Sequence, residues 1–452
     1  MITVRPRRHG SVGRFEPFET APVPERAILV GVDRGGSRWS CDDSLAELGR
    51  LAKTDGAVVV LTMKQRLDAP IPKTFIGKGK VEELVSYVRN LDADVVIFDD
   101  ELTPSQQSNL ERAVGEPVKI IDRTALILDI FGEHARTKEG RLQVQLAQLQ
   151  YVLPRLRGMW SHLVGEQTRG GIGSRFGQGE SQLEVDRRLI RDRISTLRKE
   201  LSELEKRRGV QSKARWDSGV FRVSLVGYTN AGKSSLLNRL TGAGVYAKDE
   251  LFATLDPTTR SLVLEEGRKL TLTDTVGFIQ KLPTTLVESF KSTLAEARAA
   301  DLLLLVVDGS DKRWRDQMAA VVEILRDIDS DGIRRVLVLN KIDLLTQDER
   351  IALKTENPSA VLVSAENGTG INGLLYRIGK EASEGDETIT ALIPYSKGLL
   401  LKMCHERCQV IRERYVDGGL LATLKASERM RATLEPYRVD DDLESNAAQK
   451  KQ

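Results

Sequence analysis

Cysteine is scarce in this chain of 452 residues, with Cys41, Cys404 and Cys408 as the only three. Three cysteines cannot all pair with one another, so a disulfide scaffold is excluded and a reducing compartment is favoured. No apolar run approaches the roughly 18 residues that a membrane span needs. The basic N-terminus lacks the apolar core of a secretory signal. We therefore expect a soluble, cytoplasmic protein without a transmembrane segment.

An excess of charge of either sign is also missing, because 68 Lys and Arg face 65 Asp and Glu, for a net charge of +3. Affinity for nucleic acid would have to come from local basic patches. The length indicates three or four domains, at about 100–200 residues each. The expected parts are a disordered basic tail at 1–24, an α/β domain at 25–135, an antiparallel helical hairpin at 136–215, a second α/β domain at 216–382 and a small α+β domain at 383–452.

Strands that alternate with helices predict parallel sheets covered by helices, so the expected fold class is α/β. A helix is expected to begin at Pro104, because Thr103 and Gln106 form a capping-box pattern around it. The predicted strands lie at 27–32, 57–61, 95–98 and 118–121 in the first domain, and at 221–226, 270–273, 302–307, 336–339 and 361–363 in the second.

Long helices with a glycine-rich connection are expected between residues 141 and 208. Ile190, Leu197 and Leu204 recur at heptad spacing, which predicts a helical seam. The connection holds six glycines between residues 165 and 179, and residues 155–193 carry eight arginines against five acids. Such a tip is suited to RNA, with Arg169 and Arg175 as candidate contacts. The alternative is a solvated charged helix with a loose tip.

Residues 227–234 read GYTNAGKS and fit G-x-x-x-x-G-K-[ST], between a predicted strand and a helix. The backbone amides of such a loop point at phosphate oxygens, Lys233 supplies a charge to the β- and γ-phosphates, and the Ser234 hydroxyl can bind Mg²⁺. The candidate nucleotide-binding residues of this loop are Gly227, Tyr228, Thr229, Asn230, Ala231, Gly232, Lys233, Ser234 and Ser235.

A second motif, residues 274–277 (DTVG), follows a predicted strand. Asp274 is placed to hold Mg²⁺ through water, and the Gly277 amide can sense the γ-phosphate. Thr275 and Val276 complete this motif. Between the two motifs, residues 252–259 are expected to form a mobile switch segment, in which Thr254 and Thr258 both qualify as the ligand of Mg²⁺ and the γ-phosphate.

Two further motifs are predicted to select the base of the nucleotide. Residues 340–343 read NKID and residues 364–366 read SAE, each after a predicted strand. The Asp343 carboxylate can accept both donors of the guanine edge, whereas adenine offers an acceptor there, so guanine is favoured. The candidate base-binding residues are Asn340, Lys341, Ile342, Asp343, Ser364, Ala365 and Glu366.

Phe278 stands where many GTPases carry the glutamine that orients the attacking water, so slow intrinsic hydrolysis is expected. The Asn230 side chain is a candidate for holding K⁺ beside the phosphates. The alternative is that Asn230 only shapes the loop.

These motifs resemble the HflX family of translational GTPases. The resemblance rests on residues 227–234 (GYTNAGKS), 252–256 (FATLD), 274–277 (DTVG), 340–343 (NKID), 170–188 and 75–80, and spans residues 25–380. It implies that Thr254 is the switch threonine, which with Lys233 and Gly277 serves catalysis and with Ser234 binds the metal. It also places Phe252, Ala253, Leu255 and Asp256 at the nucleotide.

The resemblance further implies a GTP hydrolase that binds the rRNA of the large ribosomal subunit and separates or rescues ribosomes. The implied location is the cytoplasm and the ribosome, with a peripheral position at the membrane as an alternative. An additional ATPase activity is left open, although residues 25–135 show no P-loop. A monomer is expected. Rival interpretations are a GTPase in ribosome assembly or RNA modification, and an RNA-binding scaffold in which the nucleotide is structural.

Overall fold

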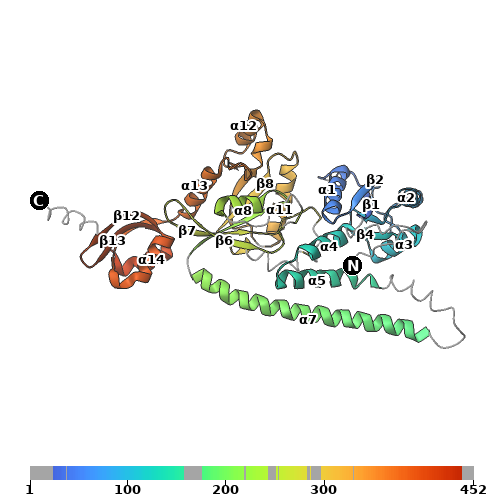
Figure 1. Cartoon of the computed structure of the whole chain (residues 1–452), viewed down its shortest axis with the longest axis horizontal. Helices are drawn as coiled ribbons and strands as arrows, with labels where there is room; N and C mark the ends of the chain where they lie inside the picture. The colour runs from blue at the N-terminus through green and yellow to red at the C-terminus, as the bar shows by residue number, and fades with distance from the viewer. Residues whose placement is uncertain are drawn as a thin grey trace, which may run out of the picture. The chain divides into compact units, whose positions relative to one another are not determined.

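The computed structural model describes residues 24–36, 38–156, 176–217, 220–242, 251–252, 254–281, 286, 297–328 and 330–439 (Figure 1). The chain divides into two compact units, residues 1–133 with 148–192 and residues 134–147 with 193–452. The five-part division expected from the sequence stays a prediction. The fold class is α/β, as the sequence predicts.

The first unit contains a parallel four-stranded sheet in the order β2-β1-β3-β4. All four predicted strands are present. The helix expected at Pro104 also begins there, because the Thr103 hydroxyl accepts the amide of Gln106 and the Gln106 side chain accepts the amide of Thr103. The elements are β1 (Arg26–Asp33), α1 (Cys41–Thr54), β2 (Val58–Arg66), α2 (Lys78–Asn90), β3 (Val95–Phe98), α3 (Pro104–Val114), β4 (Lys119–Asp122) and α4 (Arg123–His134).

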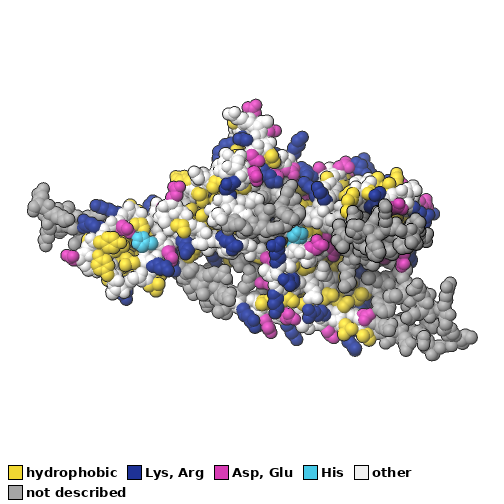
Figure 2. Space-filling view, in the orientation of Figure 1, with side chains coloured by type: hydrophobic (Ala, Val, Ile, Leu, Met, Phe, Trp, Pro, Cys, Tyr) yellow, Lys and Arg dark blue, Asp and Glu magenta, His cyan; other side chains and the backbone are white. Residues whose placement is uncertain are grey.

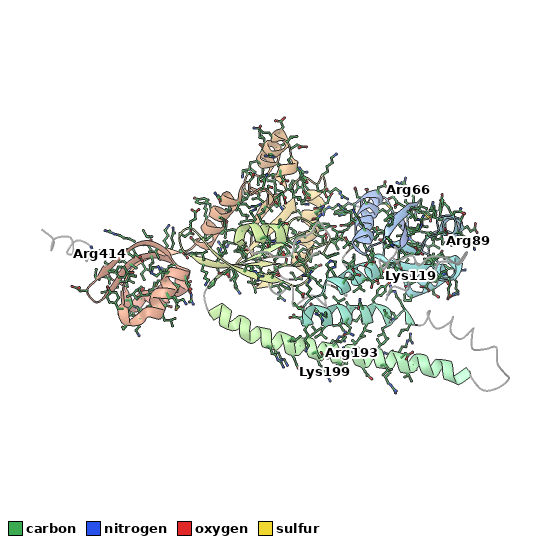
Figure 3. The ribbon with its side chains drawn as sticks, viewed as in Figure 1. Arg66, Arg89, Lys119, Arg193, Lys199 and Arg414 are labelled. Carbon is green, nitrogen blue, oxygen red and sulfur yellow. The ribbon has the colours of Figure 1, made fainter. Side chains whose placement is uncertain are left out.

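Two long helices follow, α5 (Lys138–Val152) and α7 (Phe176–Asp217). Within the second unit they contact each other where the Arg193 guanidinium donates to the Gln145 side chain at 3.0 Å. Of the predicted heptad seam, Leu197 is buried, and Ile190 and Leu204 are partly buried. The side chains of Arg193 and Lys199 extend from α7 (Figure 3).

The larger sheet of the second unit has six strands in the order β10-β9-β8-β5-β7-β6, of which only β6 is antiparallel to its neighbour. The five predicted strands are present, and β6 was not predicted. Leucine and valine side chains from these strands form the core with α8 and α13. The elements are β5 (Phe221–Gly227), α8 (Lys233–Thr241), β6 (Thr258–Val263), β7 (Lys269–Asp274), β8 (Leu302–Asp308), α11 (Trp314–Asp327), β9 (Arg334–Asn340), α12 (Gln347–Glu356), β10 (Val361–Leu362) and α13 (Ile371–Ala382).

A small antiparallel sheet, β11-β13-β12, ends the described chain, with α14 and α15 packed on it. Cys404 and Cys408 are buried in its core and pack there with apolar side chains. Its elements are β11 (Glu387–Pro394), α14 (Gly398–Arg407), β12 (Gln409–Val416), β13 (Gly419–Ala426) and α15 (Glu428–Leu434).

Acidic and basic side chains are interspersed over the face seen in Figure 2, in keeping with the balanced composition. Among the described residues, no helix combines the length and the apolar character that crossing a bilayer requires.

Candidate nucleotide-binding site

The motifs of the second α/β region meet at the carboxyl edge of the six-stranded sheet. β5 ends at Gly227, β7 at Asp274, β8 at Asp308 and β9 at Asn340. These four strands are parallel neighbours, so their carboxyl ends share one edge. Ligands of open α/β sheets bind at this edge.

The loop after β5 is closed so tightly that two of its positions require glycine. A Cβ at Gly227 would overlap the carbonyl oxygen of Val306, and a Cβ at Gly232 would overlap the Asn340 side chain. Gly232 also has φ +87°, which favours glycine. Helix α8 starts directly after it, so the loop ends at a helix N-terminus. This arrangement of backbone amides and positive dipole end is suited to an anion such as phosphate.

Lys233 is buried under this loop. Its ammonium group donates to the carbonyl oxygens of Gly227 at 3.2 Å and Tyr228 at 2.9 Å. Burial lowers the pKa of Lys233 to about 8, while the nearby Asp274 carboxylate raises it. A buried cation held by uncharged partners attracts a polyanion strongly, because little water screens it.

Three oxygen-bearing side chains converge beside Lys233. The Ser234 hydroxyl lies 2.7 Å from the Thr254 hydroxyl and donates to Asp274 Oδ2 at 2.6 Å. Asp274 is fully buried, its Oδ1 has no hydrogen-bond partner, and burial raises its pKa. Hard oxygen ligands around an unsatisfied carboxylate oxygen fit Mg²⁺. Thr258, the alternative switch threonine, begins strand β6.

The segment after Asp274 is bonded to the phosphate loop. The amide of Thr229 donates to the Phe278 carbonyl at 2.7 Å, and the amide of Phe278 donates to the Gly227 carbonyl at 3.1 Å. A Cβ at Gly277 would lie 2.8 Å from the Thr229 methyl group and 3.1 Å from Lys233 Nζ, so the bare backbone approaches the lysine closely. The Phe278 ring is 1% exposed and carries no polar atom, so it cannot orient water.

The base-reading motifs hold one another in place. The Asn340 amide donates to the Ala231 carbonyl at 2.9 Å and accepts from the amide of Ala365 at 3.0 Å. Asp343 accepts a hydrogen bond from the Ser364 hydroxyl. These contacts join the NKID motif to the SAE loop and, through Asn340, to the phosphate loop.

Two residues of this pocket were not predicted. Arg239 on α8 donates to the carbonyl oxygens of Ala365 and Glu366, and so fixes the SAE loop. Asp308 pairs with the Lys341 ammonium group at 2.8 Å and so fixes the end of that side chain. Asp308 directly follows the predicted strand at 302–307, so the strand-end argument that found Asp274 would also have found it. An arginine in the last turn of a short helix gives no comparable signal.

The other residues that the sequence analysis places at the nucleotide or at RNA lie as follows. Asp256 accepts hydrogen bonds from the backbone amides of Arg136 and Thr137, at the start of α5. Ala253, Arg169 and Arg175 lie outside the described residues. Phe252, Leu255, Thr275 and Val276 are buried.

A mostly parallel sheet whose strand ends carry GYTNAGKS, DTVG, NKID and SAE together defines a P-loop GTPase. Three family models match the chain: "GTP-binding GTPase N-terminal" at residues 42–132, "GTP-binding GTPase Middle Region" at 134–215 and "50S ribosome-binding GTPase" at 222–341.

Curated relatives extend the similarity to nearly the whole chain. "GTPase HflX" of Caldanaerobacter subterraneus subsp. tengcongensis is 47% identical over 91% of this chain and 94% of its own. "GTPase HflX" of Escherichia coli K12 is 44% identical over 89% and 93%. A crystal structure of SsGBP in complex with GDP is 26% identical, with a TM-score of 0.44 over 79% of this chain and 99% of its own. The chain belongs to the HflX family of GTPases and is a GTP hydrolase.

Proposed function

We propose that this GTPase binds the large ribosomal subunit and couples GTP binding and hydrolysis to ribosome dissociation or rescue. The observation that carries the proposal is the match of residues 222–341 to a family described as 50S ribosome-binding GTPases. The glycine- and arginine-rich stretch at 155–193, which suits rRNA, supports it. We also propose that the protein is a cytoplasmic monomer that associates with the ribosome.

In the proposed reaction the phosphate loop and Lys233 bind the triphosphate, and Asp343 and Asn340 read the guanine. Ser234 and Thr254 would hold Mg²⁺ directly, and Asp274 would hold it through water. The ion neutralises charge on the β- and γ-phosphates when bound. The Gly277 amide would then sense the γ-phosphate. Water is the nucleophile, and because Phe278 cannot orient it, the group that does is expected from the ribosome.

We also propose that the Asn230 side chain helps to hold K⁺ at the phosphates. Asn230 lies in the loop with φ +59°, between the buried Thr229 and Ala231. A monovalent cation there would add positive charge to that of Lys233 and Mg²⁺. Hydrolysis should be faster in KCl than in NaCl of equal ionic strength, and Asn230→Ala should remove the difference. Equal rates in both salts would contradict the proposal.

Cosedimentation with separated ribosomal subunits tests the main proposal. The protein is incubated with either subunit and with a non-hydrolysable GTP analogue or GDP. We expect pelleting with the large subunit and the analogue, and weak pelleting with GDP. Failure to pellet with either subunit would overturn the proposal. Hydrolysis that stays at its background rate with saturating subunits would favour the RNA-binding scaffold instead.

A further inference from the structure

The switch segment is attached to a part of the chain outside the sheet domain. The Asp256 carboxylate accepts the backbone amides of Arg136 at 3.0 Å and Thr137 at 2.8 Å, and also the Thr137 hydroxyl. One side chain therefore makes three hydrogen bonds to two consecutive residues that are about 120 positions earlier in the sequence. Hydrogen bonds to a carboxylate are stronger than those between neutral groups.

Those two residues directly precede helix α5, which begins at Lys138. The Thr137 hydroxyl accepts the amide of Gly140 at 3.0 Å, and the Thr137 carbonyl accepts the amide of Arg141 at 3.1 Å, as a capping residue does. The Asp256 carboxylate thus lies against the positive end of a helix dipole, where a negative charge is stabilised.

Glycine at position 140 is what permits this close approach. A Cβ on Gly140 would lie 2.5 Å from Asp256 Oδ1 and 3.2 Å from the Thr137 hydroxyl. Real Cβ atoms do not come that near an oxygen, so any larger residue at 140 would push the carboxylate away. The contact therefore depends both on the carboxylate of Asp256 and on the absence of a side chain at Gly140.

Asp256 and Thr254 are separated by one residue, the buried Leu255. Two residues span at most about 7 Å, so fixing Asp256 restricts where the Thr254 hydroxyl can lie. That hydroxyl is 2.7 Å from Ser234, beside Asp274. We propose that Asp256 is a positioning residue: through its contact with Thr137 and Gly140, the start of α5 sets the place of Thr254 in the Mg²⁺ and γ-phosphate site.

This inference rests on the nucleotide site and goes beyond the proposed ribosome step. Helix α5 lies in the region matched by the middle-region family model, and its N-terminal end contacts Asp256 of the switch segment. A partner that moves α5 would therefore change hydrolysis without touching the nucleotide. Guanosine diphosphate lacks the group that a switch threonine contacts, so its binding should not depend on Asp256.

The test measures steady-state GTP hydrolysis and GDP affinity on the full chain without ribosomes. Asp256→Ala removes all three hydrogen bonds to Asp256. It should lower kcat about tenfold or more and leave the Kd for GDP within about twofold. It should also raise the Mg²⁺ concentration needed for half-maximal rate. Gly140→Ala should reproduce the pattern from the other side of the contact. Asp256→Asn, which keeps one acceptor oxygen, should fall between Asp256→Ala and the native chain.

Gly373→Ala is the matched control, because Gly373 is also the third residue of a helix and a Cβ there meets nothing within 4 Å. It should keep native kcat. If Asp256→Ala lowers kcat and Gly140→Ala does not, Asp256 acts at the nucleotide itself and the inference is overturned. Native kcat in both variants, or an equal loss of GDP affinity, overturns it as well. Should Asp256→Ala not fold, Gly140→Ala and Thr137→Val decide the question.

Discussion

Asp343 is held by the Ser364 hydroxyl, which leaves its carboxylate as an acceptor for the proposed guanine edge. In Asp343→Asn one acceptor becomes a donor and faces the guanine amino group. We expect GTP affinity to fall about 100-fold or more, because the site then holds unpaired donors. Xanthosine triphosphate, which carries a carbonyl oxygen in place of that amino group, should bind the variant better than GTP. Titration calorimetry with both nucleotides measures the exchange of preference.

Asp348→Asn is the control for that exchange, since it makes the same chemical change on an exposed side chain of α12. It should leave both affinities unchanged. Retention of a native preference for GTP in Asp343→Asn would show that another group reads the base.

The lowered pKa of Lys233 predicts that, as pH rises, GTP affinity falls while the nucleotide-free protein becomes more stable. Burial lowers its pKa to about 8, so the ammonium loses its proton as pH rises through that value. Phosphate attracts the charged form, so GTP affinity should fall with a slope that approaches tenfold per pH unit above about pH 8. The unfolded chain keeps the lysine charged up to its ordinary pKa of 10.5. Between these two values the unfolded state binds more protons, and this group makes the nucleotide-free protein more stable as pH rises.

Calorimetry between about pH 7 and pH 9 measures the binding slope, and thermal unfolding of the nucleotide-free protein measures the stability. Lys233→Met reports the part of the slope that comes from the nucleotide. Identical slopes in the native chain and in this variant would refute the role of the lysine.

At this scale the sequence predicts the residues of the pocket wherever a motif fixes both residue type and position. Lys233, Asp274 and Asp343 come from such motifs, and the structure brings their strand ends to one edge. The contact of Arg239 with Ala365 and the contact of Asp256 with Thr137 could not be predicted from the sequence. They join positions more than a hundred residues apart, and no local pattern encodes such a pairing.

Elements whose apolar runs are long and unbroken were predicted correctly, as β8 illustrates with six consecutive buried residues. The missed strand, β6, reads TTRSLV and lies at the edge of the sheet, where one side of the strand remains exposed. Edge strands carry fewer apolar residues, so their hydrophobic signal is weak. For this reason the start of β6 was predicted only as part of the switch segment.

The hairpin between β6 and β7 is joined to the start of the last sheet by one buried arginine. Arg268 donates to the Ala382 carbonyl and to the Asp386 carboxylate, and the two charged side chains are 5% and 3% exposed. Arg268→Met should lower the free energy of unfolding by about 3–5 kcal/mol, because it leaves Asp386 buried without its partner. Urea unfolding measures this loss.

Arg334→Met is the comparison for that loss, since Arg334 pairs with Glu381 and Glu384 while 41% exposed. It should cost about 1 kcal/mol or less. The double variant Arg268→Met with Asp386→Leu should regain most of the stability. An Arg268→Met protein as stable as Arg334→Met would show that the buried pair contributes nothing.

At the scale of the whole molecule, a net charge of +3 on 452 residues provides little general attraction to RNA. The proposed ribosome contact therefore depends on where the arginines are concentrated, and residues 155–193 are the arginine-rich stretch that the sequence offers for it. We predict that Arg169→Glu with Arg175→Glu weakens pelleting with the large subunit. The slope of log affinity against log salt should become shallower by about 0.7–0.9 for each phosphate that the variant no longer neutralises, while GTP affinity stays native.

The matched control reverses two exposed charges of α7 outside that stretch, Arg198→Glu with Lys199→Glu. Both double variants change the net charge by the same amount, so any difference between them reports position and not total charge. If the two variants pellet alike across a salt series, the glycine-rich stretch is not the RNA-binding surface. If only the Arg169 and Arg175 variant loses binding, the balanced chain owes its ribosome affinity to a local cluster, as its composition requires.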